Sequence, residues 1–182
     1  NSMHSINPPL TRNNFLELNI DNIVEHTFEW LLEKTNDVNQ NKALYFSIRK
    51  KVDKILEILL QTCLFMNVNF TFETTGCQFD WTLQIINEIN AYNYNVLLLY
   101  PFTTNKQLLV DRATTRGKIT GRYITMDDFN KYNYIQKASD EFDNKIIPHR
   151  KLFSTIIKYK AEIPLDQNEL KMNDMYFVYK DN

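Results

Sequence analysis

The run VLLLY at residues 96–100 is the segment that most constrains the fold. Its five side chains lack the polar alternation of a strand that faces water on one side, and Pro101 closes the run. A strand of this kind is usually buried on both faces, as in a parallel sheet covered by helices. The run therefore predicts a parallel sheet inside this chain.

Neighbouring segments supply further strands and the helices between them. Apolar and polar residues alternate from Phe15 to Ile20 and from Asn69 to Phe72, which is the period of a half-buried strand. We also expect a strand at residues 175–179 and a strand or a helix at 151–159. Apolar residues at three- and four-residue steps predict helices at about 21–34, 48–63, 81–89, 105–116 and 126–146. This alternation predicts a doubly wound, mainly parallel α/β sheet flanked by helices.

Length and composition limit the class of protein. A chain of 182 residues is long enough for one domain with a core, which we expect to span residues 1–182 with residues 1–13 as an arm or loop. A net charge of −1 gives no global attraction to nucleic acid or to an anionic membrane, and no apolar run is long enough to span a bilayer. Cys63 and Cys77 show neither disulfide nor metal-ligand spacing, so we expect reduced thiols and a cytoplasmic protein.

Two expected strands are followed closely by a carboxylate. Asp21 follows the first strand, and Glu73 follows the second. Ligands of open parallel sheets bind at the carboxyl ends of the strands, so these two acids are candidates to bind a metal, orient a hydroxyl or accept a proton. The alternative is that Asp21 only caps a helix and that Glu73 is a solvated strand end.

A group of arginines follows in the segment DRATTRGKITGR, residues 111–122. Arg112 and Arg116 are four residues apart and share a helical face, whereas Arg122 follows a glycine-containing turn that makes residues 106–125 a lid-like segment. Guanidinium groups in this arrangement are suited to bind a phosphate chain through bidentate contacts. The alternatives are a solvated basic helix end and, since aromatic residues are sparse there, a less favoured contact with nucleic acid.

In combination, these motifs resemble the zeta-toxin family of P-loop kinases. The resemblance covers residues 15–182 and rests on the order LELNID, FETTG, VLLLYP, R-x-x-x-R, TGR and MYFVYKDN. It implies that Asp21 is the general base for a substrate hydroxyl. It also implies that the substrate is bound by Glu73, Thr75 and Gly76, and that the nucleotide phosphates are contacted by Arg112, Arg116 and Arg122.

The resemblance further implies a P-loop-kinase-like fold and a phosphoryl transfer from ATP or GTP, with Mg²⁺, to the hydroxyl of a small molecule. The expected partners are a nucleotide and this acceptor, and the resemblance allows for a protein inhibitor; no metal ligand of this chain is assigned. The chain departs from the family at Cys77, where many members have an arginine, and it contains no G-x-x-x-x-G-K-[ST] phosphate loop.

We expect an amino-terminal strand and phosphate loop upstream of Asn1. The rival interpretation is a remodelled relative that works without a nucleotide. A degenerate kinase-like domain that acts as a binding or protein-interaction module is therefore the first alternative function, and a nucleic-acid end kinase or binder is the second.

Overall fold

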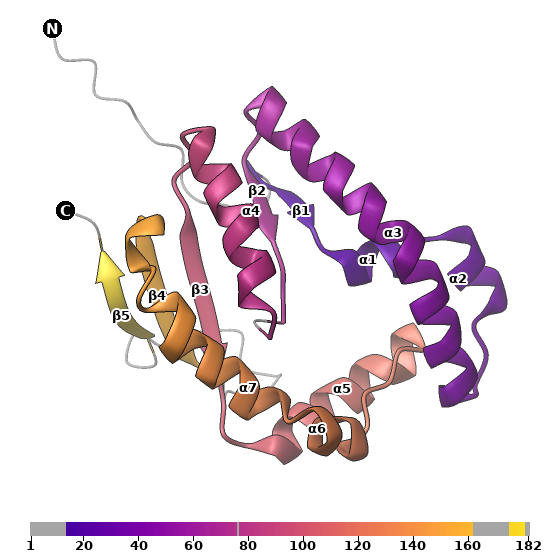
Figure 1. The fold of residues 1–182 in the computed structure, drawn as a ribbon. Coiled ribbons are helices and arrows are strands. Elements are labelled where there is room, and N and C mark those ends of the chain that lie inside the picture. The colour runs from indigo at the N-terminus through magenta and orange to yellow at the C-terminus, as the bar shows by residue number, and fades with distance from the viewer. Residues whose placement is uncertain (1–13, 76, 162–174, 181–182) are drawn as a thin grey trace, which may run out of the picture.

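The computed structural model describes residues 14–75, 77–161 and 175–180, and their strands form two sheets (Figure 1). In the first sheet, β1 (Leu16–Leu18) pairs in parallel with β2 (Phe70–Phe72). In the second, β3 (Leu97–Phe102) pairs in parallel with β4 (Thr155–Lys160), and β4 pairs in antiparallel fashion with β5 (Met175–Lys180). Each strand lies where the sequence predicts one, and residues 151–159 form the short helix η3 and then most of β4.

Helices make up more than half of the described residues. The longest, α3, begins after Asp37, whose carboxylate accepts hydrogen bonds from the backbone amides of Asn39 and Gln40, and it ends at Asn67 in the left-handed conformation. The helices are α1 (Ile20–Glu25), α2 (Phe28–Glu33), α3 (Val38–Met66), α4 (Phe79–Ala91), α5 (Lys106–Thr120), α6 (Met126–Tyr132), α7 (Tyr134–Glu141), the π-helix η2 (Phe142–Ile146) and the 3-10 helix η3 (Arg150–Leu152).

The predicted doubly wound, P-loop-kinase-like sheet is wrong. The described strands form a sheet of two strands and a sheet of three, β2 does not pair with β3, and β5 runs antiparallel. The expected burial of the VLLLY strand on both faces is also wrong, because Leu97 is 43% and Leu99 is 55% exposed on β3, although β3 does pair in parallel with β4. Local periodicity specifies where a strand forms, whereas the edge that it pairs with depends on contacts between distant residues.

Three groups of buried side chains form the core, and α3 and α4 connect them. One group lies between α3, α4, β1 and β2, and includes Leu18, Leu60 and Ile85. The second lies between α4, β3 and β4, and the third packs α1 and α2 against the amino-terminal half of α3. The second group contains Phe79, Ile86, Phe142, Ile146, Phe153 and Ile156, and the third contains Val24, Trp30, Tyr45, Ile48 and Val52.

The lid-like segment folds differently from the expected glycine-containing turn. Helix α5 continues through the buried Gly117 to Thr120 and ends at Gly121, whose φ of 83° is favourable for glycine. Figure 1 shows α5 extending from the end of β3 toward the amino-terminal half of α3. The expected helix at 126–146 is interrupted at Asn133, where the left-handed backbone separates α6 from α7.

Among the described residues, no helix combines the length and the apolar character needed to cross a membrane.

Candidate functional site

The carboxyl ends of β1 and β2 bring two polar side chains together. Leu18 pairs with Phe72, so the residues that follow them, Asn19 and Glu73, are neighbours. The Asn19 side-chain amide donates to the Glu73 carboxylate, and its carbonyl oxygen accepts from the backbone amide of Asp21 at 2.9 Å. Asn19 is thus the cap of α1 and also holds Glu73 at the sheet edge. The alternative that Asp21 caps the helix is wrong.

Asp21 instead points into a network of side chains. Its Oδ1 atom accepts a hydrogen bond from the Tyr45 hydroxyl, and its Oδ2 atom forms an ion pair with Arg122. Arg49 donates to the same Tyr45 hydroxyl at 3.3 Å. Burial opposes ionisation of Asp21, but the hydrogen bonds from Arg122 and Tyr45 outweigh it and hold the pKa of Asp21 below its usual value. Asp21 is therefore a carboxylate at neutral pH.

Arg122 connects the end of α5 to two acids of α1. Besides Asp21, its guanidinium reaches Glu25, with Nε 3.1 Å from Oε1, and it lies 5.5 Å from the centre of the Tyr45 ring. Its side chain is only 12% exposed. Burial lowers the pKa of Arg122, but the hydrogen bond and the charge of Asp21 more than compensate and raise it above the ordinary value.

Two polar contacts hold the backbone that leads into Arg122. The indole of Trp30 donates to the carbonyl of Thr120 at 3.1 Å, and the side-chain amide of Asn41 donates to the carbonyl of Gly121 at 2.8 Å. Both donors are buried. The carboxyl end of α5 is therefore docked on α2 and α3, and this docking aims Arg122 at α1.

Arg116 lies one helical turn before the end of α5 and is exposed. Burial and the neighbouring charge of Arg122 lower the pKa of Arg116, while Asp21, Glu25 and Glu73 oppose that shift. Its guanidinium is thus within electrostatic reach of the acids at the ends of both strands. An exposed cation beside a half-buried ion pair is available to an anionic ligand.

Arg112 lies two turns before the end of α5, close to the end of β4. Its Nη1 atom donates to the carbonyl of Ala161 at 3.0 Å. Burial and then the charge of Glu73 raise the pKa of Tyr159, and Arg112 opposes that shift. Glu73 and Arg112 are thus each within electrostatic reach of Tyr159, and the contact with Ala161 places Arg112 near the end of β4.

The structure brings together four of the seven residues proposed from the sequence, Asp21, Glu73, Arg116 and Arg122. Asp21 forms an ion pair with Arg122, and the charges of Asp21, Glu73 and Arg122 act on Arg116 at the carboxyl ends of β1 and β2. A fifth, Arg112, lies toward the end of β4, where it contacts Ala161.

The other two proposed residues belong to the FETTG segment. Thr75 is exposed, and its carbonyl oxygen lies 3.5 Å from the Sγ atom of Cys77. Burial raises the pKa of the Cys77 thiol. Gly76 lies outside the described residues. The contact described for Thr75 is therefore with Cys77, and it does not link Thr75 to the acids and arginines of the site.

Sequence reasoning missed Asn19, Glu25 and Tyr45. The most useful signal was the position of Tyr45, which lies three residues before Ile48 and therefore on the apolar face of α3. A buried tyrosine usually finds a partner for its hydroxyl, so a tyrosine on that face indicates a polar group beneath the helix. Its partner, Asp21, is distant in sequence, and no local pattern specifies it.

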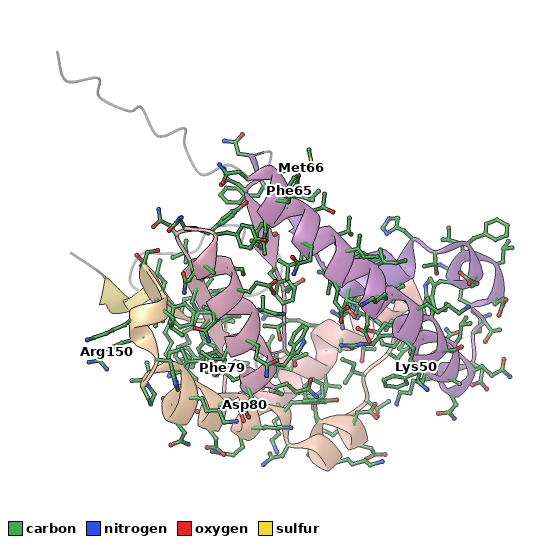
Figure 2. The ribbon with its side chains drawn as sticks, turned by 45° about the horizontal axis from the view of Figure 1, so that its top comes forward. Lys50, Phe65, Met66, Phe79, Asp80 and Arg150 are labelled. Carbon is green, nitrogen blue, oxygen red and sulfur yellow. The ribbon has the colours of Figure 1, made fainter. Side chains whose placement is uncertain are left out.

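A separate apolar groove of about 800 Å³ lies between α3 and α4. Its walls include Ile58, Phe65, Met66 and Trp81, and Figure 2 shows Phe65 and Met66 at the carboxyl end of α3. None of the residues proposed from the sequence lines it. The acids and arginines at the strand ends are thus the candidate site.

Comparisons with known proteins leave the family of this chain open. No protein family matches it, and no solved structure matches it. The chain is similar to an uncharacterized protein of Acanthamoeba polyphaga mimivirus, with 33% identity over 75 residues. The match covers 41% of this chain and 22% of the length of the viral protein.

Proposed function

We propose that the acids and arginines at the ends of β1 and β2 form part of a phosphotransferase site, where a phosphoryl group passes from ATP or GTP to the hydroxyl of a small molecule. The observation that carries this proposal is the contact between Asp21 and Arg122, with Arg116 and Glu73 within electrostatic reach. Phosphoryl transfer needs a carboxylate to receive the hydroxyl proton and cations to stabilise the charge on the phosphoryl oxygens. These residues supply both.

Each side chain has one role in this reaction. The acceptor oxygen forms a bond to the γ-phosphorus, its proton passes to Asp21, and the bond to the leaving nucleoside diphosphate breaks. Arg116 and Arg122 neutralise the transferring group, since guanidinium groups bind phosphate oxygens in bidentate geometry. Glu73, held by Asn19, accepts a hydrogen bond from another hydroxyl of the acceptor. Arg122 must leave Asp21 before that carboxylate can receive a proton.

Magnesium enters this proposal with the nucleotide. The described residues gather no group of three or more His, Cys, Asp or Glu side chains that could hold a metal ion. Mg²⁺ usually keeps several waters and binds to substrate phosphates with few protein ligands, so the proposal assigns it none in this chain. A cytoplasmic location, where ATP and GTP are available, agrees with the two free cysteines.

The second candidate function is a kinase-like binding module without phosphoryl transfer. The observation that favours it is that both carboxylate oxygens of Asp21 are already occupied, by Tyr45 and by Arg122. The sequence also contains no G-x-x-x-x-G-K-[ST] loop to hold the donor phosphates through backbone amides. Nucleic-acid binding is less favoured, because the net charge of −1 gives this chain no global attraction to a polyanionic backbone.

The test uses ATP and GTP labelled at the γ-phosphate, with Mg²⁺ and a panel of small hydroxyl compounds. We expect the full chain to transfer or hydrolyse the label, and Asp21→Asn to lower the rate at least about 100-fold, as for loss of a general base. Lys118→Gln is the control, because Lys118 is an exposed cation of the same helix. The proposal is contradicted if wild type neither transfers nor hydrolyses the label, or if wild type and Asp21→Asn do so at equal rates.

A further inference from the structure

Tyr45 is a core residue whose hydroxyl reaches the candidate site. The residue is 8% exposed and packs with Val24, Trp30, Ile48 and Val52. Its ring meets that of Trp30 edge-on, with the centroids 6.3 Å apart. The ring therefore has little freedom to turn, and the direction of its hydroxyl is fixed by the packing of α3 against α1 and α2.

The two oxygens of Asp21 have partners of different kinds. The partner of Oδ1 is Tyr45, which is held by the core, and the partner of Oδ2 is Arg122, which follows the end of α5. A tyrosine hydroxyl donates one hydrogen bond and carries no charge at neutral pH, so an incoming anion attracts it less than it attracts a guanidinium. A guanidinium has five N–H groups and binds phosphate readily. An anionic ligand therefore competes for Arg122 and leaves Tyr45 in place.

Arg122 is incompletely satisfied where it stands. Its Nε atom is buried and forms an ion pair with Glu25 at 3.1 Å, but it makes no hydrogen bond to the residues that the structure describes. A buried N–H group without a hydrogen bond is unfavourable, because it has lost its hydrogen bonds to water and gained none in the protein. A phosphate oxygen that accepted from this group would recover part of that cost. Arg122 therefore leaves its place for a phosphate more readily than a guanidinium with all of its hydrogen bonds made.

We propose that Tyr45 is a positioning residue that holds Asp21 through Oδ1, and that Arg122 covers Oδ2 until a phosphate group draws it away. The inference rests on the proposed function, because it assumes that Asp21 receives the proton of the acceptor. Oδ2 is then the oxygen that meets the acceptor hydroxyl. The proposal adds an order to the reaction: the phosphate of the donor binds first, and only then is Asp21 open to the acceptor.

The charged and titratable groups around Asp21 determine how its pKa responds. Tyr45 of α3 bonds to Asp21, and Arg49 of the same helix donates to the Tyr45 hydroxyl. Arg116 of α5 and Arg122 act on Asp21 from the other side, and Glu25 of α1 pairs with Arg122. Burial and then Asp21 raise the pKa of Tyr45, so its hydroxyl remains a donor at neutral pH. Since the Tyr45 hydrogen bond lowers the pKa of Asp21, its removal raises that pKa. Departure of Arg122 raises it too.

The test measures the pKa of the Asp21 carboxyl by ¹³C NMR in the full chain, which requires no enzymatic activity. We expect a higher pKa in Tyr45→Phe than in wild type. The matched control is Tyr94→Phe, which also removes a tyrosine hydroxyl, one that donates to the carbonyls of Cys63 and Val68 at 2.9 and 3.1 Å. Tyr94→Phe should leave the pKa of Asp21 unchanged. An equal Asp21 pKa in wild type and Tyr45→Phe overturns the proposal.

A second measurement keeps the proposal testable if Tyr45→Phe does not fold. In Arg122→Gln, Asp21 should keep one side-chain rotamer in its NMR couplings, because Tyr45 still holds it, and rotamer averaging overturns the positioning role. Inorganic pyrophosphate added to wild type should raise the pKa of Asp21, and a saturating amount that leaves it unchanged overturns the proposed order. Support from both measurements without phosphoryl transfer by wild type confirms the positioning role and refutes the proposed function.

Discussion

Substitution of Asn41 by alanine should weaken the docking of the end of α5 on α3. Asn41 is 2% exposed, and its side chain makes three hydrogen bonds of 2.8 Å: Nδ2 donates to the carbonyls of Thr35 and Gly121, and Oδ1 accepts from the amide of Thr35. At about 0.5–1.5 kcal/mol each, the loss of these three hydrogen bonds should lower the free energy of unfolding by about 1.5–4.5 kcal/mol. This is a large part of the about 5–15 kcal/mol that stabilises a typical domain.

Equilibrium unfolding in urea measures this effect, and the control is Asn39→Ala, which removes an exposed asparagine of the same helix turn. We expect the control to change the free energy of unfolding by less than about 0.5 kcal/mol. The slope of free energy against urea concentration should be the same in wild type and Asn41→Ala. A loss below about 1 kcal/mol for Asn41→Ala, or one equal to that of the control, would refute this account of how the lid-like segment is held.

Two further predictions concern α5 and the next helix, α6. A methyl group on Gly117 would lie 2.5 Å from Cδ1 of Tyr123, so Gly117→Ala should cost about 1–3 kcal/mol by urea unfolding. In a Tyr123→Ala background, Gly117→Ala should leave the free energy of unfolding unchanged or raise it, because alanine has a higher helix propensity than glycine. An equal loss of free energy in both backgrounds would contradict this reasoning. Burial opposes ionisation of Asp128, but hydrogen bonds from Lys42 and Thr125 lower its pKa to about 2. The melting temperature of wild type should fall as the pH drops from 3.8 toward 2, and that of Asp128→Asn should fall less over the same range. Identical plots of melting temperature against pH for the two proteins would contradict this prediction.

The sequence allowed the positions of the strands to be predicted because period-two alternation and apolar runs are local signals. It did not allow their pairing to be predicted. Residues 97–102 form the expected strand, yet Leu97 and Leu99 are exposed, because the apolar run does not specify what packs on its second face. Gly117 was expected in a turn and lies inside α5, where it admits the ring of Tyr123. That contact depends on how the chain returns after Gly121.

The candidate site likewise contains residues that could be predicted from local sequence patterns and residues that could not. The acids after β1 and β2 could be predicted, because parallel strands bring their carboxyl ends to one edge. The i, i+4 spacing of Arg112 and Arg116 likewise placed both on one face of α5. Tyr45 could not be assigned, since its apolar surroundings are typical of a packing residue and Asp21 is distant in sequence.

The most direct test of the central claim is a calorimetric titration of the full chain with MgATP and MgGTP. The account predicts saturable binding of at least one nucleotide and an affinity at least about 10-fold lower in Arg116→Gln, because a hydrogen bond to a charged group contributes about 1.5–3 kcal/mol. Lys118→Gln should bind like wild type. Undetectable binding of both nucleotides by wild type, or equal affinities in Arg116→Gln and Lys118→Gln, would contradict the claim that this edge binds phosphate.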